Sequence, residues 1–267
     1  MVDYAGLASY YAASEATDGL LPGYTYRFKT RAKNLIGYSE FSVDAYIAFG
    51  NVPNKPDPPA RLSSTTTSIT VEWTEPASSD LATSGYILNM DDGQRTDLLP
   101  IYIGLSQSDI FTFQAGGLTT GLPYRFSVQA VNENGYSEES DYITYYACQV
   151  PSGLSTPIYV SSDQLTKQIT MSWSTPESNG GCPILGYELY RNDGDNADLT
   201  IKIDDLVNDN PSLSQHTIDL STDGVVGRVY RLKVRAINAA GSADSSSLSV
   251  ALASLPDKPS TSPETDD

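Results

Sequence analysis

The sequence is poor in basic residues, histidine and cysteine, and each shortage excludes a class of function. Its 267 residues contain 16 Lys and Arg against 33 Asp and Glu, which gives a formal net charge of -17. Such an excess of acid opposes binding to nucleic acids and to anionic membranes. One histidine and two cysteines cannot build a zinc site of four Cys, or of two Cys and two His. We therefore expect that the protein binds no nucleic acid, no metal and no cofactor, and that it does not insert into a membrane.

Long apolar runs and targeting signals are missing as well. No stretch approaches the roughly 18 consecutive apolar residues that a membrane-spanning helix needs. The first residues lack the basic, apolar and small-residue order of a signal peptide. We interpret the chain as an excerpt from a longer protein, so the missing signal is weak evidence about location.

Catalytic motifs are not found in the sequence. His216 is the single histidine, and no serine is surrounded by a histidine and acid pattern. Neither a Gly-x-Ser-x-Gly turn nor a phosphate-binding glycine loop is present. We therefore expect no enzyme, no catalytic residues and no cofactor-binding residues.

What the sequence does contain favours β-structure. It has 18 Tyr, 20 Gly and 16 Pro, so segments rich in aromatic and β-branched residues are broken at short intervals by turn-forming residues. This composition predicts an all-β chain.

An internal repeat determines the fold class. Three segments align without gaps, YRFKTRAKNLIGYSE, YRFSVQAVNENGYSE and YRLKVRAINAAGSAD, and they start at Tyr26, Tyr124 and Tyr230. Each has alanine, asparagine and glycine at the same three later positions. A second pattern, SITVEWTEP and QITMSWSTP, occurs twice and makes Trp73 and Trp173 equivalent. Recurrence at about 100 residues indicates repeated structural modules.

Residues alternate within these segments as they do in half-buried strands. Beginning at each lead tyrosine, every second residue is apolar or small, and polar side chains fill most positions between. The Asn-to-Gly stretch that follows is typical of a hairpin turn into a last strand. About seven short strands per 100 residues predict two antiparallel sheets packed face to face.

The chain at this point resembles the fibronectin type III family of the immunoglobulin-like β-sandwich superfamily. The resemblance rests on Trp-x-x-Pro after the second strand, Gly-Tyr on the third, and a tyrosine-corner pattern before the sixth. It implies that each corner tyrosine (Tyr26, Tyr124, Tyr230) bonds backward to the backbone with its ring in the core. We also expect these tyrosines to hold Trp73 and Trp173 in place between the sheets.

The proline-rich stretches set the expected module boundaries. We predict a partial module in residues 1–51 that holds only the later strands, which we name module 1. Two complete modules follow, module 2 in residues 52–149 and module 3 in residues 150–254. Residues 255–267 are then a Pro/Ser/Thr-rich linker to a further module. Module 1 aligns from its fourth strand onward, so it is a fragment, an unfolded stub, or a half-sandwich completed by strands from another copy.

The two cysteines are candidates for a disulfide. Cys148 ends the last strand of module 2, and Cys182 lies in the loop after Trp173 in module 3. In this fold a module's entry and that loop lie at the same pole, so a bond would tie the linker to the module it enters. Such a bond argues for an oxidising, extracellular setting. Two independent free thiols are the alternative.

Basic residues gather on the repeated strands, and we name these the basic stripe. We expect these residues to project from the outer face of the sheet. Two interpretations are open: the stripe binds an anionic glycan or an acidic neighbour, or it is a solvated face whose cations pair with Asp and Glu. The stripe comprises Arg27, Lys29, Arg31, Lys33, Arg231, Lys233 and Arg235.

The sequence thus predicts a non-enzymatic structural or adhesive array, extracellular or at the cell surface. Its partners would be other copies of itself or adjacent modules of its parent, and an anionic glycan is a further candidate. A fibre-forming subunit completed by a neighbouring copy is one form of this hypothesis. The alternatives are a receptor or adhesion ectodomain that binds through its loops, and accessory modules of a large secreted enzyme. If both cysteines are reduced, an intracellular cytoskeletal or ciliary scaffold is a further alternative.

Overall fold

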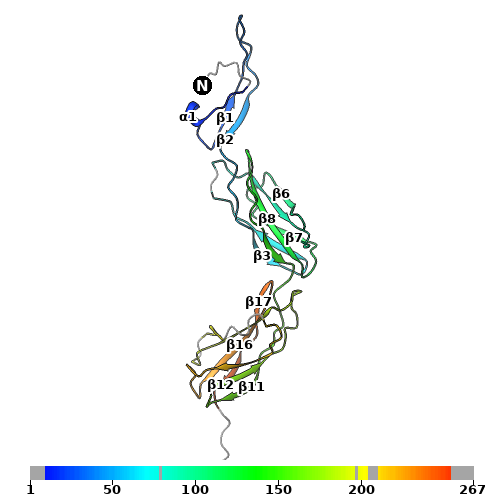
Figure 1. The fold of residues 1–267 in the computed structure, drawn as a ribbon, viewed down its shortest axis with the longest axis vertical. Helices are drawn as coiled ribbons and strands as arrows, with labels where there is room; N and C mark the ends of the chain where they lie inside the picture. Colours follow the sequence, from blue (N-terminus) through cyan, green and yellow to red (C-terminus); the bar gives the residue numbers. More distant parts are fainter. Residues whose placement is uncertain (1–9, 78–79, 196–197, 204–209, 254–267) are drawn as a thin grey trace, which may run out of the picture. The chain divides into compact units, whose positions relative to one another are not determined.

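The computed structural model describes residues 10–77, 80–195, 198–203 and 210–253 (Figure 1). The predicted linker at 255–267 lies outside these residues. The chain divides into two compact units, one of residues 1–63, 68–118 and 122–145, and one of residues 64–67, 119–121 and 146–267. Each sandwich is described by itself below.

Module 2 forms two antiparallel sheets, as the sequence predicts. One sheet has the order β3-β4-β7, and the other has the order β10-β8-β5-β6 with β9 beside β8. In chain order the strands are β3 Ala60–Ser64, β4 Ser68–Glu72, β5 Gly85–Met90, β6 Leu99–Gly104, β7 Thr112–Gly116, β8 Pro123–Asn132, β9 Gly135–Tyr136 and β10 Ile143–Tyr146.

Module 3 repeats this arrangement. Its sheets have the orders β11-β12-β15 and β14-β13-β16-β17, with β18 beside β16. The strands are β11 Ile158–Asp163, β12 Gln168–Ser172, β13 Gly186–Arg191, β14 Ile201–Ile203, β15 Gln215–Asp219, β16 Val229–Asn238, β17 Gly241–Asp244 and β18 Leu248–Ala251. The fold class predicted from the repeat is confirmed.

Module 1 contains one strand pair and a short helix. Strand β1 (Tyr24–Phe28) pairs antiparallel with β2 (Ala45–Phe49). Helix α1 (Glu15–Asp18) was not expected from the sequence; the Ser14 hydroxyl accepts from the Thr17 amide at its start, and Gly19 ends it at a φ of 66°. Local capping by Ser14 and Gly19 explains this single turn.

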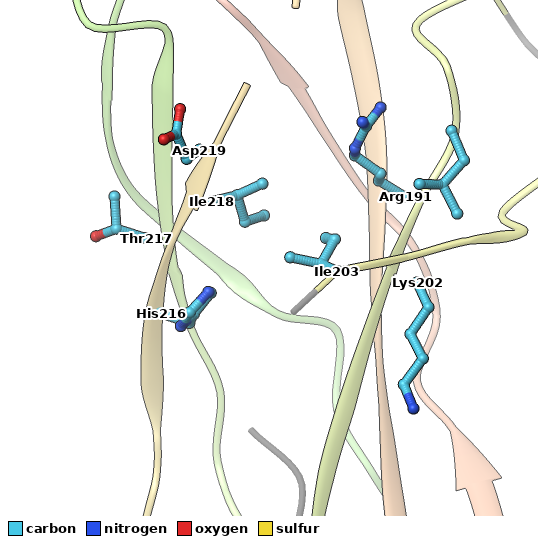
Figure 2. Close-up of a pocket in the computed structure, with 8 residues that line it drawn as sticks. Arg191, Lys202, Ile203, His216, Thr217, Ile218 and Asp219 are labelled. Atoms are coloured by element: carbon cyan, nitrogen blue, oxygen red, sulfur yellow. The ribbon is translucent and has the colours of Figure 1, made fainter. Parts of the chain in front are cut away.

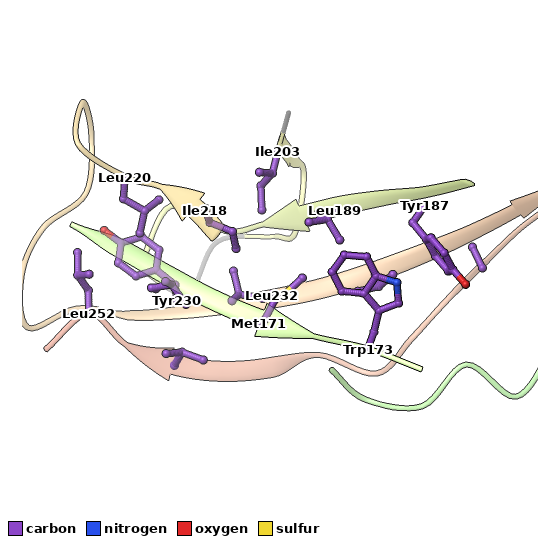
Figure 3. Close-up of a cluster of buried hydrophobic side chains, with 14 residues drawn as sticks. Met171, Trp173, Tyr187, Leu189, Ile203, Ile218, Leu220, Tyr230, Leu232 and Leu252 are labelled. Carbon is purple, nitrogen blue, oxygen red and sulfur yellow. The ribbon is translucent and has the colours of Figure 1, made fainter. Parts of the chain in front are cut away.

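The interior of module 3 lies between its two sheets (Figure 3). Strand β16 alternates strictly, so Tyr230, Leu232, Val234 and Ala236 are fully buried while the residues between them are half-buried. Side chains of β12 and β15 meet this strand from the opposite sheet. Burial of this set provides the main favourable term of folding.

The two tryptophans are buried, but their partners differ from the expectation. Trp73 and Trp173 are each 4% exposed, as predicted. The ring of Trp173 packs edge-on against Tyr187 at a centroid distance of 5.5 Å, and Trp73 packs against Tyr86 at 5.9 Å. Tyr230 lies at the other end of the core, beside Leu220 and Leu252 (Figure 3). The prediction that the corner tyrosine holds the tryptophan was therefore wrong, because the Gly-Tyr strand crosses nearer to it.

The corner tyrosines bond backward as the family resemblance implies. The Tyr230 hydroxyl accepts from the Val225 amide at 2.9 Å, and the Tyr26 hydroxyl accepts from the Leu21 amide at 2.6 Å. Each bond spans five residues and fixes the loop before a long strand.

The last strand of each module is interrupted, which the sequence analysis did not anticipate. Ser137 and Ser140 face β8 where a continuous strand would pair, and their hydroxyls accept from the Ala130 and Val128 amides at 3.0 Å each. Ser245 does the same for Val234 at 3.0 Å. The hydroxyls satisfy strand amides that would otherwise be buried without a partner. The repeated Ser after the Gly of the turn was the available signal.

We expect Tyr230→Phe to lower the free energy of unfolding of module 3 by about 1 kcal/mol, because the Val225 amide loses its acceptor. Tyr187→Phe is the matched control. Its hydroxyl is buried without a hydrogen-bond partner among the described residues, so its removal should be neutral or stabilising. Denaturant unfolding followed by tryptophan fluorescence measures both variants, and equal losses would contradict the assignment.

Candidate functional site

Two of the three members of the basic stripe in module 3, Lys233 and Arg235, are paired internally. The Arg235 guanidinium bonds both oxygens of Asp244, with Nε to Oδ1 at 2.6 Å and Nη2 to Oδ2 at 3.1 Å. The Lys233 ammonium reaches Oδ2 of the same carboxylate at 2.7 Å. Both cations also lie over the Tyr190 ring, at 4.8 Å and 5.2 Å from its centroid. The solvated, paired reading of the stripe describes these two residues.

Asp244 is the electrostatic centre of this group. The hydrogen bond from Arg235 is the main cause that lowers its pKa from an ordinary 3.8 to about 2; Lys233 contributes in the same direction, and partial burial opposes both. The same ion pair raises the pKa of Arg235. The side chains of Lys233, Arg235 and Asp244 therefore pair with one another.

The stripe in module 1 is only partly paired. Arg27 and Lys29 lie 3.6 Å and 3.1 Å from the Asp44 carboxylate. Arg31 and Lys33 instead lie over the Tyr38 ring, at 3.9 Å and 4.9 Å from its centroid. Cation–π contacts leave the outward N–H groups of an exposed cation able to bind an anion. If the stripe binds a partner, the Arg31 and Lys33 end is the part that can do so.

The predicted disulfide is present. Cys148 and Cys182 are bonded at a Cα–Cα distance of 5.8 Å, and both are buried next to Ala240. The linker after Cys148 is bonded to the same loop, because the Gln149 amide donates to the Gly180 carbonyl at 2.8 Å. Ser152 and Ser178 exchange both backbone hydrogen bonds. The linker is thus fixed to module 3 by covalent and backbone bonds.

A cavity of about 250 Å³ opens between β14 and β15 of module 3 (Figure 2). Ile203 and Ile218 point toward each other across it, and Arg191 and half-buried His216 complete its walls. The Arg191 guanidinium is already paired with Asp223 and bonds the Asn192 carbonyl at 3.1 Å. The space is smaller than the 300–1,000 Å³ typical of ligand pockets, and its one buried cation is engaged. We assign it no ligand.

Two negative findings concern the described part of the chain. Within it, no group of three or more His, Cys, Asp or Glu side chains is placed to hold a metal ion. Within the same residues, no helix is long and apolar enough to cross a membrane.

The Asp244 pairing predicts a pH dependence for module 3. A carboxylate with a lowered pKa stabilises the fold above its unfolded value of about 3.8, and that contribution is lost as pH falls from there through about 2. Asp244→Asn should lower the free energy of unfolding by about 1 kcal/mol at pH 6, a figure reduced for solvent exposure. The difference from the unmodified protein should shrink below pH 4 in urea titrations. A difference that stays constant down to pH 2 would contradict the prediction.

Comparisons with known proteins match this architecture. Residues 56–145 match the family model of the fibronectin type III domain. Fibronectin type-III domain-containing protein 3A of Mus musculus is 29% identical over 245 residues, which cover 90% of this chain and 19% of the mouse protein. Myomesin-2 of Homo sapiens is 33% identical over 238 residues, which cover 83% of this chain and 15% of the human protein.

The crystal structure of chicken CNTN1 FN1-FN3 domains covers 88% of this chain and 80% of its own, at 18% identity and a TM-score of 0.45. The chain spans under a fifth of the length of the mouse and human relatives. The resemblance stated from the sequence is confirmed: residues 56–145 belong to the fibronectin type III domain family, and modules 2 and 3 are successive antiparallel β-sandwiches with the same strand order.

Proposed function

We propose that this chain is a non-enzymatic structural segment, a series of modules that spaces and presents protein-binding surface outside the cell or at its surface. The observation that carries the proposal is the buried Cys148–Cys182 disulfide, which ties a linker to the module it enters. A structural disulfide persists in an oxidising compartment. The boundaries at 1–51, 52–149, 150–254 and 255–267 are part of the proposal.

The disulfide would act mechanically. Pulling on a module extends its unfolded chain by roughly 3.3–3.6 Å per residue. A bond between residues 34 positions apart keeps the stretch from Cys148 to Cys182 out of that extension. A linker locked in this way limits how far module 3 can lengthen under load, which suits a spacer.

Single-molecule force spectroscopy of the full chain tests this role. Unfolding of module 3 in reductant should release about 110 Å more contour length than in the oxidised protein, from 34 residues at the extension given above. The Cys148→Ala/Cys182→Ala variant should show the long release in both buffers and lose roughly 3–4 kcal/mol of stability. Equal lengths with and without reductant would refute the mechanical role. Free thiols at both positions in protein from its native source would refute the extracellular setting.

A second candidate, a fibre-forming subunit, is favoured by the exposed face of module 1. Residues that face each other across β1 and β2 include Tyr26 opposite Ile47 and Tyr24 opposite Phe49. On this face Ile47 is 55% exposed and Tyr24 is 60% exposed. The same face is covered in module 2, where Phe126, the counterpart of Phe28 in the repeat, is fully buried. An apolar sheet face of this kind is stabilised by covering strands, which a neighbouring copy would supply in a fibre.

Self-association has a matched pair of variants. Ile47→Lys places a charge on the apolar face, whereas Tyr46→Lys places one on the opposite face of the same strand. We expect concentration-dependent oligomers in sedimentation and electron microscopy that Ile47→Lys abolishes and Tyr46→Lys leaves intact. A monomer at all concentrations would refute the fibre and leave the spacer proposal standing.

A further inference from the structure

The turn that ends each long strand contains the same Asn-x-x-Gly pattern. In module 2 it runs from Asn132 to Gly135, and in module 3 from Asn238 to Gly241. Both asparagines are buried, at 5% and 3% exposure. This turn had a local explanation in the sequence analysis, as the hairpin after the strand. Its buried amides contact more than the hairpin.

The oxygen of each asparagine is used within the turn. Asn238 Oδ1 accepts from the amides of Ala240 at 2.8 Å and Gly241 at 3.1 Å, and Asn132 Oδ1 accepts from the Asn134 amide at 2.9 Å. Because backbone donors face the oxygen, the side-chain orientation is set, and the Nδ2 group is directed away from the turn.

The Nδ2 group bonds the linker that enters the module. Asn132 Nδ2 donates to the Asn51 carbonyl at 2.9 Å, and Asn238 Nδ2 donates to the Gln149 carbonyl at 2.7 Å. The two carbonyls precede equivalent dipeptides, Val52-Pro53 and Val150-Pro151. The same donor thus binds the same linker position in two modules.

The glycine of the turn accommodates the linker valine. Gly135 and Gly241 have φ values of 135° and 141°, in the region that disfavours a side chain. A Cβ on Gly241 would lie 3.1 Å from the Val150 side chain, and one on Gly135 would lie 3.5 Å from the Val52 side chain. The prolines that follow, Pro53 and Pro151, are buried. In both modules the linker is bound by this hydrogen bond, an aliphatic contact and a buried proline. Further bonds differ between the modules: Asn134 Nδ2 donates to the Gly50 carbonyl at 2.7 Å in module 2, and Asn238 Nδ2 also donates to the Asn179 carbonyl at 2.7 Å in module 3.

We propose that the Asn-x-x-Gly turn is a binding site for an extended x-aliphatic-Pro segment, and that the turn from Asn34 to Gly37 in module 1 is a third copy of it. The third turn matches in the hydrogen bonds of its asparagine and differs at its glycine, because Gly37 does not have the positive φ of Gly135 and Gly241. Asn34 Oδ1 accepts from the amides of Ile36 at 2.9 Å and Gly37 at 3.1 Å, which matches Asn238 within 0.1 Å. Asn34 is exposed in the described chain. Its ligand is therefore a segment of the kind that the other two turns hold.

The chain itself contains a third segment of this kind. Ser254-Leu255-Pro256-Asp257-Lys258-Pro259 matches Asn51-Val52-Pro53-Asn54-Lys55-Pro56 in its aliphatic residue, both prolines and lysine. We take residues 254–259 as a ligand for a turn of this type, and a peptide of this sequence is a probe for the turn at Asn34. The inference concerns how linkers are bound and holds wherever the protein is located.

The most specific test of the bound turns is a substitution that removes the Nδ2 donor of the asparagine and keeps its Oδ1 acceptor. Asn132→Asp keeps Oδ1 as acceptor for the turn but removes the N–H that bonds Asn51 and places a carboxylate beside a carbonyl. We expect the ¹⁵N order parameters of Asn51 and Val52 to fall from the rigid value of about 0.85 toward 0.6, with the Trp73 fluorescence of the folded module retained. Asn34→Asp makes the same change at the same repeat position and should leave Asn51 and Val52 unaltered. Unchanged order in Asn132→Asp would overturn the proposal.

Module 3 supplies a second, conditional test. Asn238→Asp alone should change the order of Gln149 and Val150 little, because the disulfide and the Ser152–Ser178 pairing also hold that linker. In the Cys148→Ala/Cys182→Ala background the Ser152–Ser178 pairing and the Gln149–Gly180 hydrogen bond remain, and the same substitution should lower the order of Gln149 and Val150 more than it does in the disulfide-bonded protein. Equal order with and without Asn238→Asp in that background would contradict the role of the asparagine there.

The third site is tested by titration of the full chain. A synthetic peptide of residues 253–263 is added at millimolar concentration, as one hydrogen bond and one aliphatic contact imply weak binding. We expect shifts of the Asn34 side-chain amide and the Gly37 amide that are lost in Asn34→Asp and with a peptide carrying Leu255→Asp. The absence of shifts at these positions would refute peptide binding at the Asn34 turn. The role of the turns at Asn132 and Asn238 is tested separately, by Asn132→Asp.

Discussion

The ten-residue strand at the centre of each complete sandwich is the element on which the rest depends. In β16 the core-facing residues are fully buried, and the residues between them carry the charges of the outer face. Its first core residue, Tyr230, bonds back to the Val225 amide, and its last residue, Asn238, bonds the entering linker. One strand thus organises the core by its alternation, the preceding loop by its start and the linker by its end.

The charges on this strand illustrate how an acidic protein uses few cations. Lys233 and Arg235 share one carboxylate and one aromatic ring, so both cations are paired within the module. In module 1 Arg27 and Lys29 have such a carboxylate partner, Asp44, while Arg31 and Lys33 lie over Tyr38. The same stripe is therefore paired with a carboxylate in module 3, whereas Arg31 and Lys33 in module 1 lie over an aromatic ring. Sequence position alone does not distinguish these two arrangements, because both depend on the neighbouring strand.

The sequence predicted the features that local pattern and repetition encode. Alternation from Tyr124 and Tyr230 gave the long strands, the repeat gave the module type, and the positions of Cys148 and Cys182 at one pole gave the disulfide. The contacts of Trp173 were missed because the choice between Tyr187 and Tyr230 depends on which strand crosses nearer, which is a property of the packed sheets. The linker contacts of Asn132 and Asn238 were missed for a related reason. An asparagine before a glycine already has a sufficient local explanation as a turn residue.

Module 1 shows which features form from local sequence and which need contacts with other strands. Tyr26 makes the same backward hydrogen bond as Tyr230, so the corner forms from local sequence. Asn34 holds its turn with the same two bonds as Asn238, so the turn is local too. Yet Tyr26 is only half-buried and Asn34 is exposed, whereas their counterparts in module 3 are enclosed. Burial comes from the opposing sheet and the linker, and these are non-local. The corner and the turn therefore form from local sequence, and the opposing sheet and the linker add the burial.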